Sequence, residues 1–299
     1  MNTNTTDHAS PEQANPKHIN KVGVIGAGVM GAGLSQALIE TGHQVVLIDI
    51  APDALEKSMA TIQDSLRIAK MMKRIPKETD LQALRQQVYL STNLSDLADV
   101  DFVVENATEK WSIKASIYPQ IDSICKAECV FAANTSAIPI SSLAALTQRP
   151  DKILGMHFMN PVPQKATVET IRSIHTSEAT IAVSQNLLAQ MNKRAIIVND
   201  KPGFVSNRIS HLFMNEAIWV VQDEVACAKD VDDIFIECYG HTMGPLATAD
   251  LIGLDTVLHT LKVLQDNYSD EKFAPAPLLV QMVAAGKLGR KSGEGFFSY

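Results

Sequence analysis

Residues 21–49 read KVGVIGAGVMGAGLSQALIETGHQVVLID, and this stretch decides the fold. It opens with an apolar run typical of a short buried strand, which leads directly into Gly26-x-Gly28-x-x-Gly31 and a helix-forming segment, Met30 to Glu40. A second apolar run, Val45 to Ile48, ends at Asp49. Strand, glycine turn, helix and second strand in this order predict the first part of a doubly wound, mostly parallel α/β sheet of the Rossmann type.

The spacing of the three glycines is typical of a turn that binds a dinucleotide. Gly26 permits the tight turn, Gly28 lets the backbone approach a pyrophosphate, and Gly31 allows the helix to pack closely on the strand. The phosphates would then lie at the N-terminus of the helix, at Val29 and Met30, where free N–H groups and the helix dipole favour negative charge.

Asp49 distinguishes this interpretation from its alternative, a plain α/β core whose turn merely needs glycine. It stands at the end of the second strand, where an acidic side chain binds the ribose diol, and the plain core leaves it unexplained. A carboxylate there repels a 2′-phosphate, and no arginine occurs among the next three residues. The sequence therefore predicts NAD as the cofactor, in preference to NADP.

Composition narrows the class of protein. The 299 residues are 46% hydrophobic, enough for one large or two medium cores. The formal net charge is -7 without a long basic run, so we expect no nucleic-acid binding. Cys125 and Cys129 have no histidine or further cysteine nearby to complete a metal site, so we expect reduced thiols and no metal. No long apolar segment or secretory signal is visible, and we expect a cytoplasmic protein without a membrane span.

The alternation of helices and strands continues to Val198. Apolar residues three and four apart between Pro52 and Ala69 mark an amphipathic helix. The other expected helices are 80–87, 110–125 and 177–191, and the other expected strands are 88–91, 100–105, 129–133, 153–158, 167–171 and 195–198.

Beyond Val198 the pattern becomes helical. Helical periodicity extends from Phe204 to Ala228, and further helices are expected at 231–239, 255–267 and 278–285. Asp200, Pro202 and Gly203 form a natural joint. We therefore predict a disordered tail over 1–18, a Rossmann domain over 19–200, and an all-α C-terminal domain over 201–299.

Catalytic groups are expected directly after strands, because open α/β sheets bind ligands beyond the carboxyl ends of their strands. His157 is the only histidine at such a position after the glycine motif. A nicotinamide enzyme that oxidises an alcohol needs a base, and neutral imidazole accepts a proton near pH 7. Glu169, on the adjoining strand, is the best candidate to fix its tautomer. Taken alone, such a pair is more commonly a structural, hydrogen-bonded histidine.

Several motifs in fixed order change that balance. They are His157-Phe158-x-Asn160-Pro161-Val162-Pro163, Val168-Glu169, Pro202-Gly203-Phe204-x-x-Asn207-Arg208, Gly244-Pro245, Asp250-x-x-Gly253-Leu254-Asp255 and Gly289-x-Lys291-x-Gly293-x-Gly295-Phe296. With them the chain resembles the 3-hydroxyacyl-CoA dehydrogenase family from Lys21 to Tyr299, about nine-tenths of its length.

The resemblance implies a reaction and a set of roles. His157 would be the general base that Glu169 orients, in NAD-dependent oxidation of a 3-hydroxyacyl thioester to the 3-oxoacyl thioester. Ser136 and Asn207 would contact the substrate oxygen or the nicotinamide, through neutral hydrogen bonds that position a carbonyl. Ser136 also suits a helix N-cap before Ile138, and Asn207 a cap or an interdomain hydrogen bond.

Further positions follow from the same resemblance. Glu109, Lys114 and Asn134 would contact the cofactor and its surroundings, and Asn160 would contact the substrate. The C-terminal domain usually forms the dimer interface of the family, and the apolar helices 209–221 and 251–264 are consistent with a homodimer.

The sequence departs from the family where the coenzyme A part of the substrate, its handle, would bind. Lys70, Lys73, Arg74 and Lys77 would form a basic edge if the helix that begins at Pro52 continued through them, although such charges often form only a solvated face. Relatives that use coenzyme A often have a dense lysine run here and a lysine between the Pro-x-Pro loop and the glutamate, where this chain reads Gln164-Lys165-Ala166-Thr167. Positive charge is therefore thinner in this chain. We expect Lys70, Lys73 and Arg74 to bind the handle of a coenzyme A thioester.

Other activities stay open. The same motifs occur in relatives that act on acyl groups tethered to a carrier protein or on small free hydroxy acids such as carnitine and gulonate. A noncatalytic dinucleotide-binding or lens-type protein would be expected to lack His157 or Glu169, and both are present. A bifunctional fatty-acid oxidation protein would need a hydratase domain, for which 299 residues leave no room.

Overall fold

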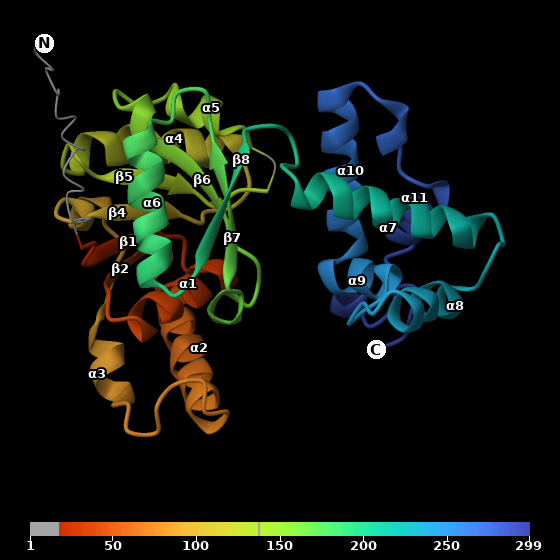
Figure 1. Ribbon diagram of the computed structural model, residues 1–299, viewed down its shortest axis with the longest axis horizontal. Coiled ribbons are helices and arrows are strands. Elements are labelled where there is room, and N and C mark those ends of the chain that lie inside the picture. The colour runs from red at the N-terminus through yellow and green to blue at the C-terminus, as the bar shows by residue number, and fades with distance from the viewer. Residues whose placement is uncertain (1–17, 137) are drawn as a thin grey trace, which may run out of the picture.

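A computed structural model describes residues 18–136 and 138–299. The predicted disordered tail, residues 1–18, lies outside the described residues except for His18. Figure 1 shows a sheet covered by helices on both faces, with a separate group of helices that follows β8 in the chain.

The sheet has eight strands in the order β3-β2-β1-β4-β5-β6-β7-β8. All neighbouring pairs are parallel except β6 and β7, which are antiparallel and bring His157 opposite Glu169. The strands are β1 (Lys21–Ile25), β2 (Gln44–Ile48), β3 (Val88–Ser91), β4 (Phe102–Glu105), β5 (Val130–Ala133), β6 (Ile153–His157), β7 (Thr167–Arg172) and β8 (Arg194–Asn199). The predicted fold class is confirmed.

Two hydrophobic cores lie on the two faces of this sheet. One includes residues of α1 (Val29–Glu40), α2 (Pro52–Met71) and α6 (Glu178–Gln190), and the other includes residues of α4 (Trp111–Ile124) and α5 (Ile140–Ala144). The short helix α3 (Leu81–Gln86) packs against α2. Short 3-10 turns occur at η1 (Leu94–Leu97), η2 (Pro150–Lys152) and η3 (Val162–Gln164), and η3 packs on α1.

The remaining helices surround a third core of their own. They are α7 (Ser206–Gln222), α8 (Ala228–Asp233), the π-helix η4 (Ile234–Cys238), α9 (Pro245–Ile252), α10 (Leu254–Tyr268), η5 (Glu271–Phe273), α11 (Pro277–Ala284) and η6 (Arg290–Ser292). The chain passes from the last strand to this group between Asn199 and Ser206.

Two helices end earlier than their periodicity predicts. The second helix stops at Met71, so the basic edge that required it to continue through Lys77 is wrong. The N–H of Arg74 binds the Ala69 carbonyl and that of Lys73 binds the Lys70 carbonyl, the pattern of a Schellman C-cap. Lys73 adopts φ 57°, a left-handed conformation that glycine usually supplies. The helix predicted to extend to Ala228 ends at Gln222 in the same way, with Glu224 at φ 57°.

The prediction of one continuous helix over 251–264 is also wrong. Gly253, at φ 102°, separates α9 from α10, and its N–H binds the Ala249 carbonyl. The predicted helix 231–239 is divided between α8 and the π-helix η4, and α5 was not predicted. No helix in the described part of the chain combines the length and the apolar character needed to cross a membrane.

Candidate functional site

The glycine turn after β1 has the geometry of a dinucleotide cradle. Gly26 adopts φ 94°, and a Cβ there would lie 2.6 Å from the Asn106 carbonyl oxygen. A Cβ on Gly31 would lie 1.8 Å from the Gly26 carbonyl oxygen, so the helix requires glycine to sit this close. Gly28 instead faces open space: apart from its two chain neighbours, no described residue has an atom within 4 Å of its Cβ position. The turn therefore fits a ligand that approaches the backbone at Gly28.

The start of α1 is suited to an anion. Gly28 is its N-cap, no side chain caps the helix within the described residues, and its first turn holds no acidic residue. The N–H groups of a first turn have no acceptors inside the helix, so those of Val29 and Met30 are available to phosphate. Val29 is exposed and Met30 is half-buried.

Asp49 lies beside this turn, as predicted. Its Oδ2 accepts a hydrogen bond from the Ala27 N–H at 2.7 Å, and its Oδ1 accepts one from the Ala51 N–H at 3.0 Å. Each carboxylate oxygen has a further lone pair, so the side chain can brace the turn and still accept hydrogen bonds from a ribose diol. These residues fit NAD.

A cavity of about 230 Å³ opens next to the start of α1. It brings together five of the predicted site residues, which come from α1, from the loops after β4 and β5, and from the last position of β6. Its lining consists of Met30, Asn106, Ala107, Glu109, Asn134, Thr135, Ser136, His157 and Phe158. The expectation that functional residues directly follow strands, the strand-exit rule, therefore located most of this cavity.

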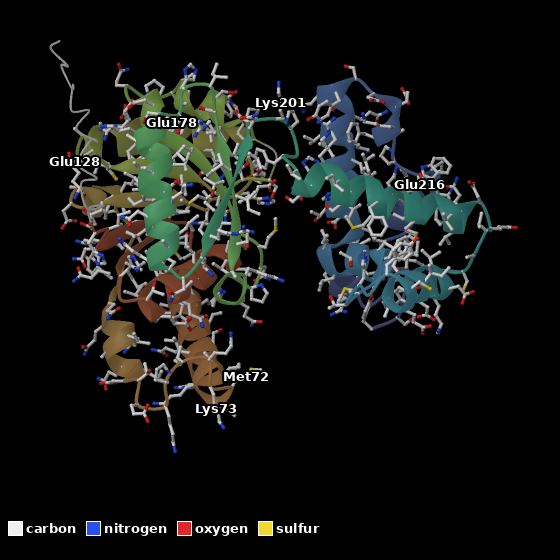
Figure 2. All side chains as sticks on the ribbon, in the orientation of Figure 1. Met72, Lys73, Glu128, Glu178, Lys201 and Glu216 are labelled. Carbon is white, nitrogen blue, oxygen red and sulfur yellow. The ribbon has the colours of Figure 1, made fainter. Side chains whose placement is uncertain are left out.

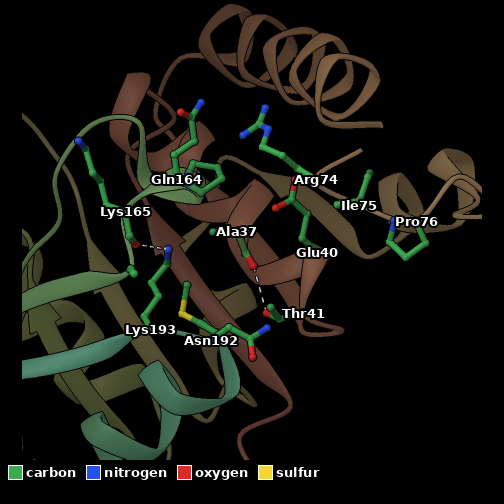
Figure 3. Close-up of a pocket in the computed structure, with 13 residues that line it drawn as sticks. Ala37, Glu40, Thr41, Arg74, Ile75, Pro76, Gln164, Lys165, Asn192 and Lys193 are labelled. Carbon is green, nitrogen blue, oxygen red and sulfur yellow. Dashed lines mark hydrogen bonds between the residues drawn. The ribbon is translucent and has the colours of Figure 1, made fainter. Parts of the chain in front are cut away.

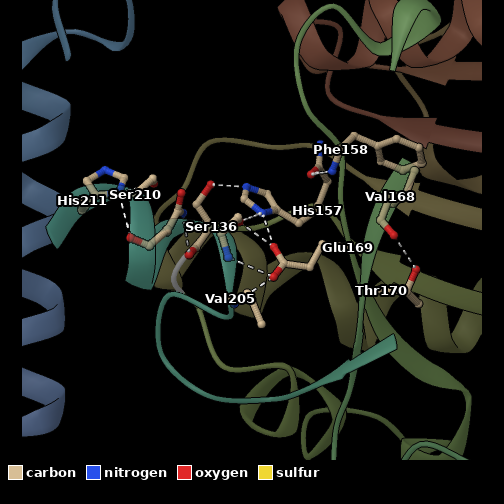
Figure 4. A network of polar contacts seen from close by, with 12 residues as sticks. Ser136, His157, Phe158, Val168, Glu169, Thr170, Val205, Ser210 and His211 are labelled. Atoms are coloured by element: carbon tan, nitrogen blue, oxygen red, sulfur yellow. Dashed lines mark hydrogen bonds and ion pairs between the residues drawn. The ribbon is translucent and has the colours of Figure 1, made fainter. Parts of the chain in front are cut away.

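His157 occupies the middle of a chain of hydrogen bonds (Figure 4). Its Nδ1 lies 3.0 Å from Glu169 Oε2, and its Nε2 lies 3.2 Å from Ser136 Oγ. A carboxylate can only accept, so Nδ1 carries the proton and Nε2 presents a lone pair. The Ser136 hydroxyl then donates to Nε2. The accepting nitrogen Nε2 thus lies beside Ser136, and both residues line the cavity.

Glu169 remains ionised at physiological pH. Burial raises the pKa of its carboxyl group, but hydrogen bonds from His157, from the Ser206 hydroxyl and from the N–H groups of Val205 and Ser206 outweigh that effect and lower the pKa to about 2. A fixed carboxylate on Nδ1 stabilises the imidazolium that forms when Nε2 takes a proton.

Lys114 contacts two residues that line the cavity, Asn134 and Glu109. It is fully buried, with Nζ 2.8 Å from Glu105 Oε1 and 3.3 Å from the Asn134 carbonyl oxygen. Glu109 lies 3.8 Å from the same ammonium and accepts hydrogen bonds from the Thr135 hydroxyl and the Ser136 N–H. Lys114 thus joins the strand exits that carry the cavity.

Asn134 joins two more of these loops. Its Nδ2 donates to Asn106 Oδ1 at 2.7 Å, and its Oδ1 accepts from the Phe158 N–H at 3.2 Å. Because Phe158 follows His157 directly, this amide helps to place the imidazole.

Three predicted residues lie differently. Asn160 is exposed and does not line the cavity. Asn207 donates from Nδ2 to the Ser136 carbonyl oxygen at 3.3 Å, a contact between the helical part and the sheet part of the chain. The Ile138 N–H binds the Thr135 hydroxyl, and not that of Ser136, so Ser136 is not the N-cap suggested as its alternative role.

The basic residues at the end of α2 and in the turn after it have different surroundings. Lys70 donates to the Thr79 carbonyl at 2.7 Å, which holds the turn between α2 and α3. Lys73 is exposed at the tip of this hairpin (Figure 2). Arg74 lines a second cavity, of about 270 Å³, together with Glu40, Lys165 and Lys193 (Figure 3). Lys70, Lys73 and Arg74 therefore form no single row.

Sequence reasoning missed Ser206, Thr135, Asn106, Ala107, Phe158 and Lys193 as parts of these sites. Asn106, Ala107 and Thr135 lie within strand-exit segments, so the rule that selected their neighbours also applied to them. Ser206 carries no such signal, because it approaches Glu169 only when α7 packs beside the sheet.

Comparison with known proteins agrees with this geometry. The family model described as the NAD binding domain of 3-hydroxyacyl-CoA dehydrogenase matches residues 21–201, and that of the C-terminal domain matches residues 203–299. A probable 3-hydroxybutyryl-CoA dehydrogenase of Bacillus subtilis is 41% identical over 267 residues, covering 89% of this chain and 92% of the relative. A 3-hydroxybutyryl-CoA dehydrogenase of Bradyrhizobium diazoefficiens is 42% identical, with 86% and 88% covered.

A solved structure leads to the same family. The crystal structure of (S)-3-hydroxybutyryl-CoA dehydrogenase from Ralstonia eutropha matches with a TM-score of 0.90 and 42% identity, over 94% of this chain and 99% of that one. The resemblance inferred from the motifs, the assignment as an oxidoreductase and the choice of NAD are confirmed. The chain belongs to the 3-hydroxyacyl-CoA dehydrogenase family of NAD-dependent enzymes.

Proposed function

We propose that this protein interconverts a 3-hydroxyacyl-CoA and the corresponding 3-oxoacyl-CoA, with His157 as the base that takes the proton of the 3-hydroxyl group. The observation that carries the proposal is the Ser136–His157–Glu169 chain of hydrogen bonds, in which Ser136 and His157 line a cavity beside the nucleotide cradle. Relatives named 3-hydroxybutyryl-CoA dehydrogenase make a short acyl chain the first substrate to test.

The proton transfer needs only residues that are already hydrogen-bonded to one another. A substrate hydroxyl that takes the donor position now held by the Ser136 hydroxyl would give its proton to His157 Nε2. Glu169 keeps Nδ1 protonated and balances the charge of the imidazolium. Ser136 would then donate its hydroxyl hydrogen to the substrate oxygen, which becomes a carbonyl.

Asn207 would hold the other side of the substrate oxygen. Its amide lies within hydrogen-bond distance of the Ser136 backbone, so a small shift would redirect Nδ2 from that carbonyl to the substrate. NAD, held by Gly26, Gly28, Gly31 and Asp49, supplies the hydride acceptor when it is bound.

The coenzyme A handle would extend toward the tip of α2. Arg74 and Lys165 contribute positive charge to the cavity of about 270 Å³, and η3, which borders it, follows directly from the loop after His157. Lys73, the residue before Arg74, is exposed in the turn after α2. These cations would attract phosphate to a protein whose net charge is -7.

A homodimer through the helical part completes the proposal. Ile209 is 63% exposed and Leu251 is 52% exposed, although both lie on helices whose other faces build a hydrophobic core. Apolar side chains of this kind favour contact with a second copy. Light scattering combined with size-exclusion chromatography should give the mass of two chains, and Leu251→Glu with Ile209→Glu should give that of one.

A substrate panel tests the function itself. Turnover with NAD should be measured on 3-hydroxybutyryl-CoA, on longer 3-hydroxyacyl-CoA thioesters, on a 3-hydroxyacyl group tethered to acyl carrier protein, and on free carnitine and gulonate. We expect the highest kcat/KM with a coenzyme A thioester. Preference for the carrier-bound group would move the proposal to that handle, and activity only on free acids would overturn it.

A further inference from the structure

We infer that Ser206 is a positioning residue for the proposed base, and that it makes the base depend on how the first turn of α7 rests against β7. The inference builds on the proposed role of His157. Several donors surround the carboxylate of Glu169, and three of them come from the two residues at the start of α7.

The Glu169 carboxylate is shared between the two parts of the chain. Oε2 accepts from His157 Nδ1 at 3.0 Å and from the Ser206 hydroxyl at 2.6 Å. Oε1 accepts from the backbone N–H of Val205 at 2.8 Å and of Ser206 at 3.2 Å. If the start of α7 moved away, His157 would remain as the sole donor among these four contacts.

Ser206 also contacts the imidazole directly. Its Oγ lies 3.3 Å from His157 Nδ1. Since the hydroxyl hydrogen points to the carboxylate, its oxygen is free to accept, so the Nδ1–H is shared between Glu169 and Ser206. Both contacts favour the proton on Nδ1, and both leave Nε2 as the accepting nitrogen. The Ser206 hydroxyl and the Glu169 carboxylate thus both favour the same tautomer of His157.

The local backbone explains why the start of α7 faces Glu169. Gly203 adopts φ 75° and Phe204 adopts φ 50°, so two consecutive residues are left-handed. This turn places the next two N–H groups, those of Val205 and Ser206, on the same carboxylate oxygen. Phe204 is a costly residue for such a conformation, but the residue is only 5% exposed, and its ring packs with the core beside His157. The chain therefore holds a strained turn where it delivers donors to Glu169.

Three variants test the inference. Ser206→Ala removes the hydroxyl, Ser206→Thr keeps it, and Ser210→Ala is the matched control, because Ser210 lies one turn later on α7 and contacts His211 instead of Glu169. With NAD and 3-hydroxybutyryl-CoA, Ser206→Ala should lower kcat and kcat/KM equally, about 10- to 100-fold, as expected for a lost hydrogen bond to a charged group. Ser206→Thr should recover most of this activity, and Ser210→Ala should match the unmodified protein.

A second readout does not depend on turnover. Nitrogen NMR of the His157 ring in the free protein should show a protonated Nδ1 in the unmodified chain and a shifted Nδ1 resonance in Ser206→Ala, because the Nδ1–H loses one of its two acceptors. An unchanged kcat and an unchanged ring spectrum in Ser206→Ala would overturn the inference, as would an equal loss in Ser206→Thr. His157→Gln distinguishes the proposed base from the positioning role of Ser206. If His157→Gln is inactive and Ser206→Ala is fully active, the proposed base stands and only the role of Ser206 is refuted.

Discussion

Lys114 and Glu105 form an ion pair with a separation of 2.8 Å, and both side chains are completely buried. Burial raises the pKa of the Glu105 carboxyl group, and the ammonium of Lys114 opposes this effect. The same ammonium also binds the carbonyl oxygen of Asn134, directly before the Thr135–Ser136 segment. The pair thus ties β4, α4 and the loop after β5 to one point.

Lys114→Met should therefore destabilise the protein strongly. It leaves a buried carboxylate without its partner, which typically costs about 3–5 kcal/mol. Adding Glu105→Gln removes the charge and keeps an acceptor for the Ala107 N–H, so the double variant should recover most of the loss. Urea unfolding at pH 7 measures both. Equal stability of the single variant and the unmodified protein would show that the pair is dispensable.

Asp49→Ala should weaken NAD binding and relax the preference over NADP. The change removes the acceptor for the ribose diol and the charge that repels a 2′-phosphate. It also removes the brace on the Ala27 N–H, so Asp49→Asn, which keeps an acceptor there, is the matched control. Calorimetric titration with both cofactors gives the two affinities. Better binding of NADP than NAD by the unmodified protein would contradict the assignment.

Glu169 should contribute to stability in a pH-dependent way. Its pKa is depressed to about 2 in the folded protein, so its contribution is present above the ordinary value of 4.5 and is lost as the pH falls toward 2. A shift of this size corresponds to about 3 kcal/mol. The difference in unfolding free energy between the unmodified protein and Glu169→Gln should therefore shrink between pH 6 and pH 3. A difference that stays constant over this range would show that the carboxylate is not specially stabilised.

Reversal of charge at Lys73 and Arg74 should affect the handle of the substrate. With both changed to Glu, the KM for 3-hydroxybutyryl-CoA should rise, whereas that for a short pantetheine thioester without the nucleotide should not change. Lys229→Glu with Lys272→Glu gives the same change in net charge on the helical part and serves as the control. A uniform rise for both substrates in the α2 variant would show that these two residues do not bind the nucleotide.

The parts of the fold that the sequence predicts best are local. The apolar runs, the glycine spacing and Asp49 lie within a single stretch, and each strand exit follows directly from the strand before it. The ends of α2 and α7 could not be predicted in this way, because the left-handed residues that follow them, Lys73 and Glu224, are not glycine. Ser206 lies 37 positions from Glu169 and approaches it only through tertiary packing. Local patterns therefore found His157 and its cavity, but not the donors that α7 brings to Glu169.

The central claim is that His157 takes the substrate proton, and His157→Gln tests it most directly. Turnover of 3-hydroxybutyryl-CoA with NAD should be measured together with the Kd for NAD in this variant and in the unmodified protein. We predict that kcat falls about 100- to 10,000-fold, because a general base is lost, while the Kd for NAD hardly changes. Turnover at the rate of the unmodified protein would contradict the account and place the base elsewhere.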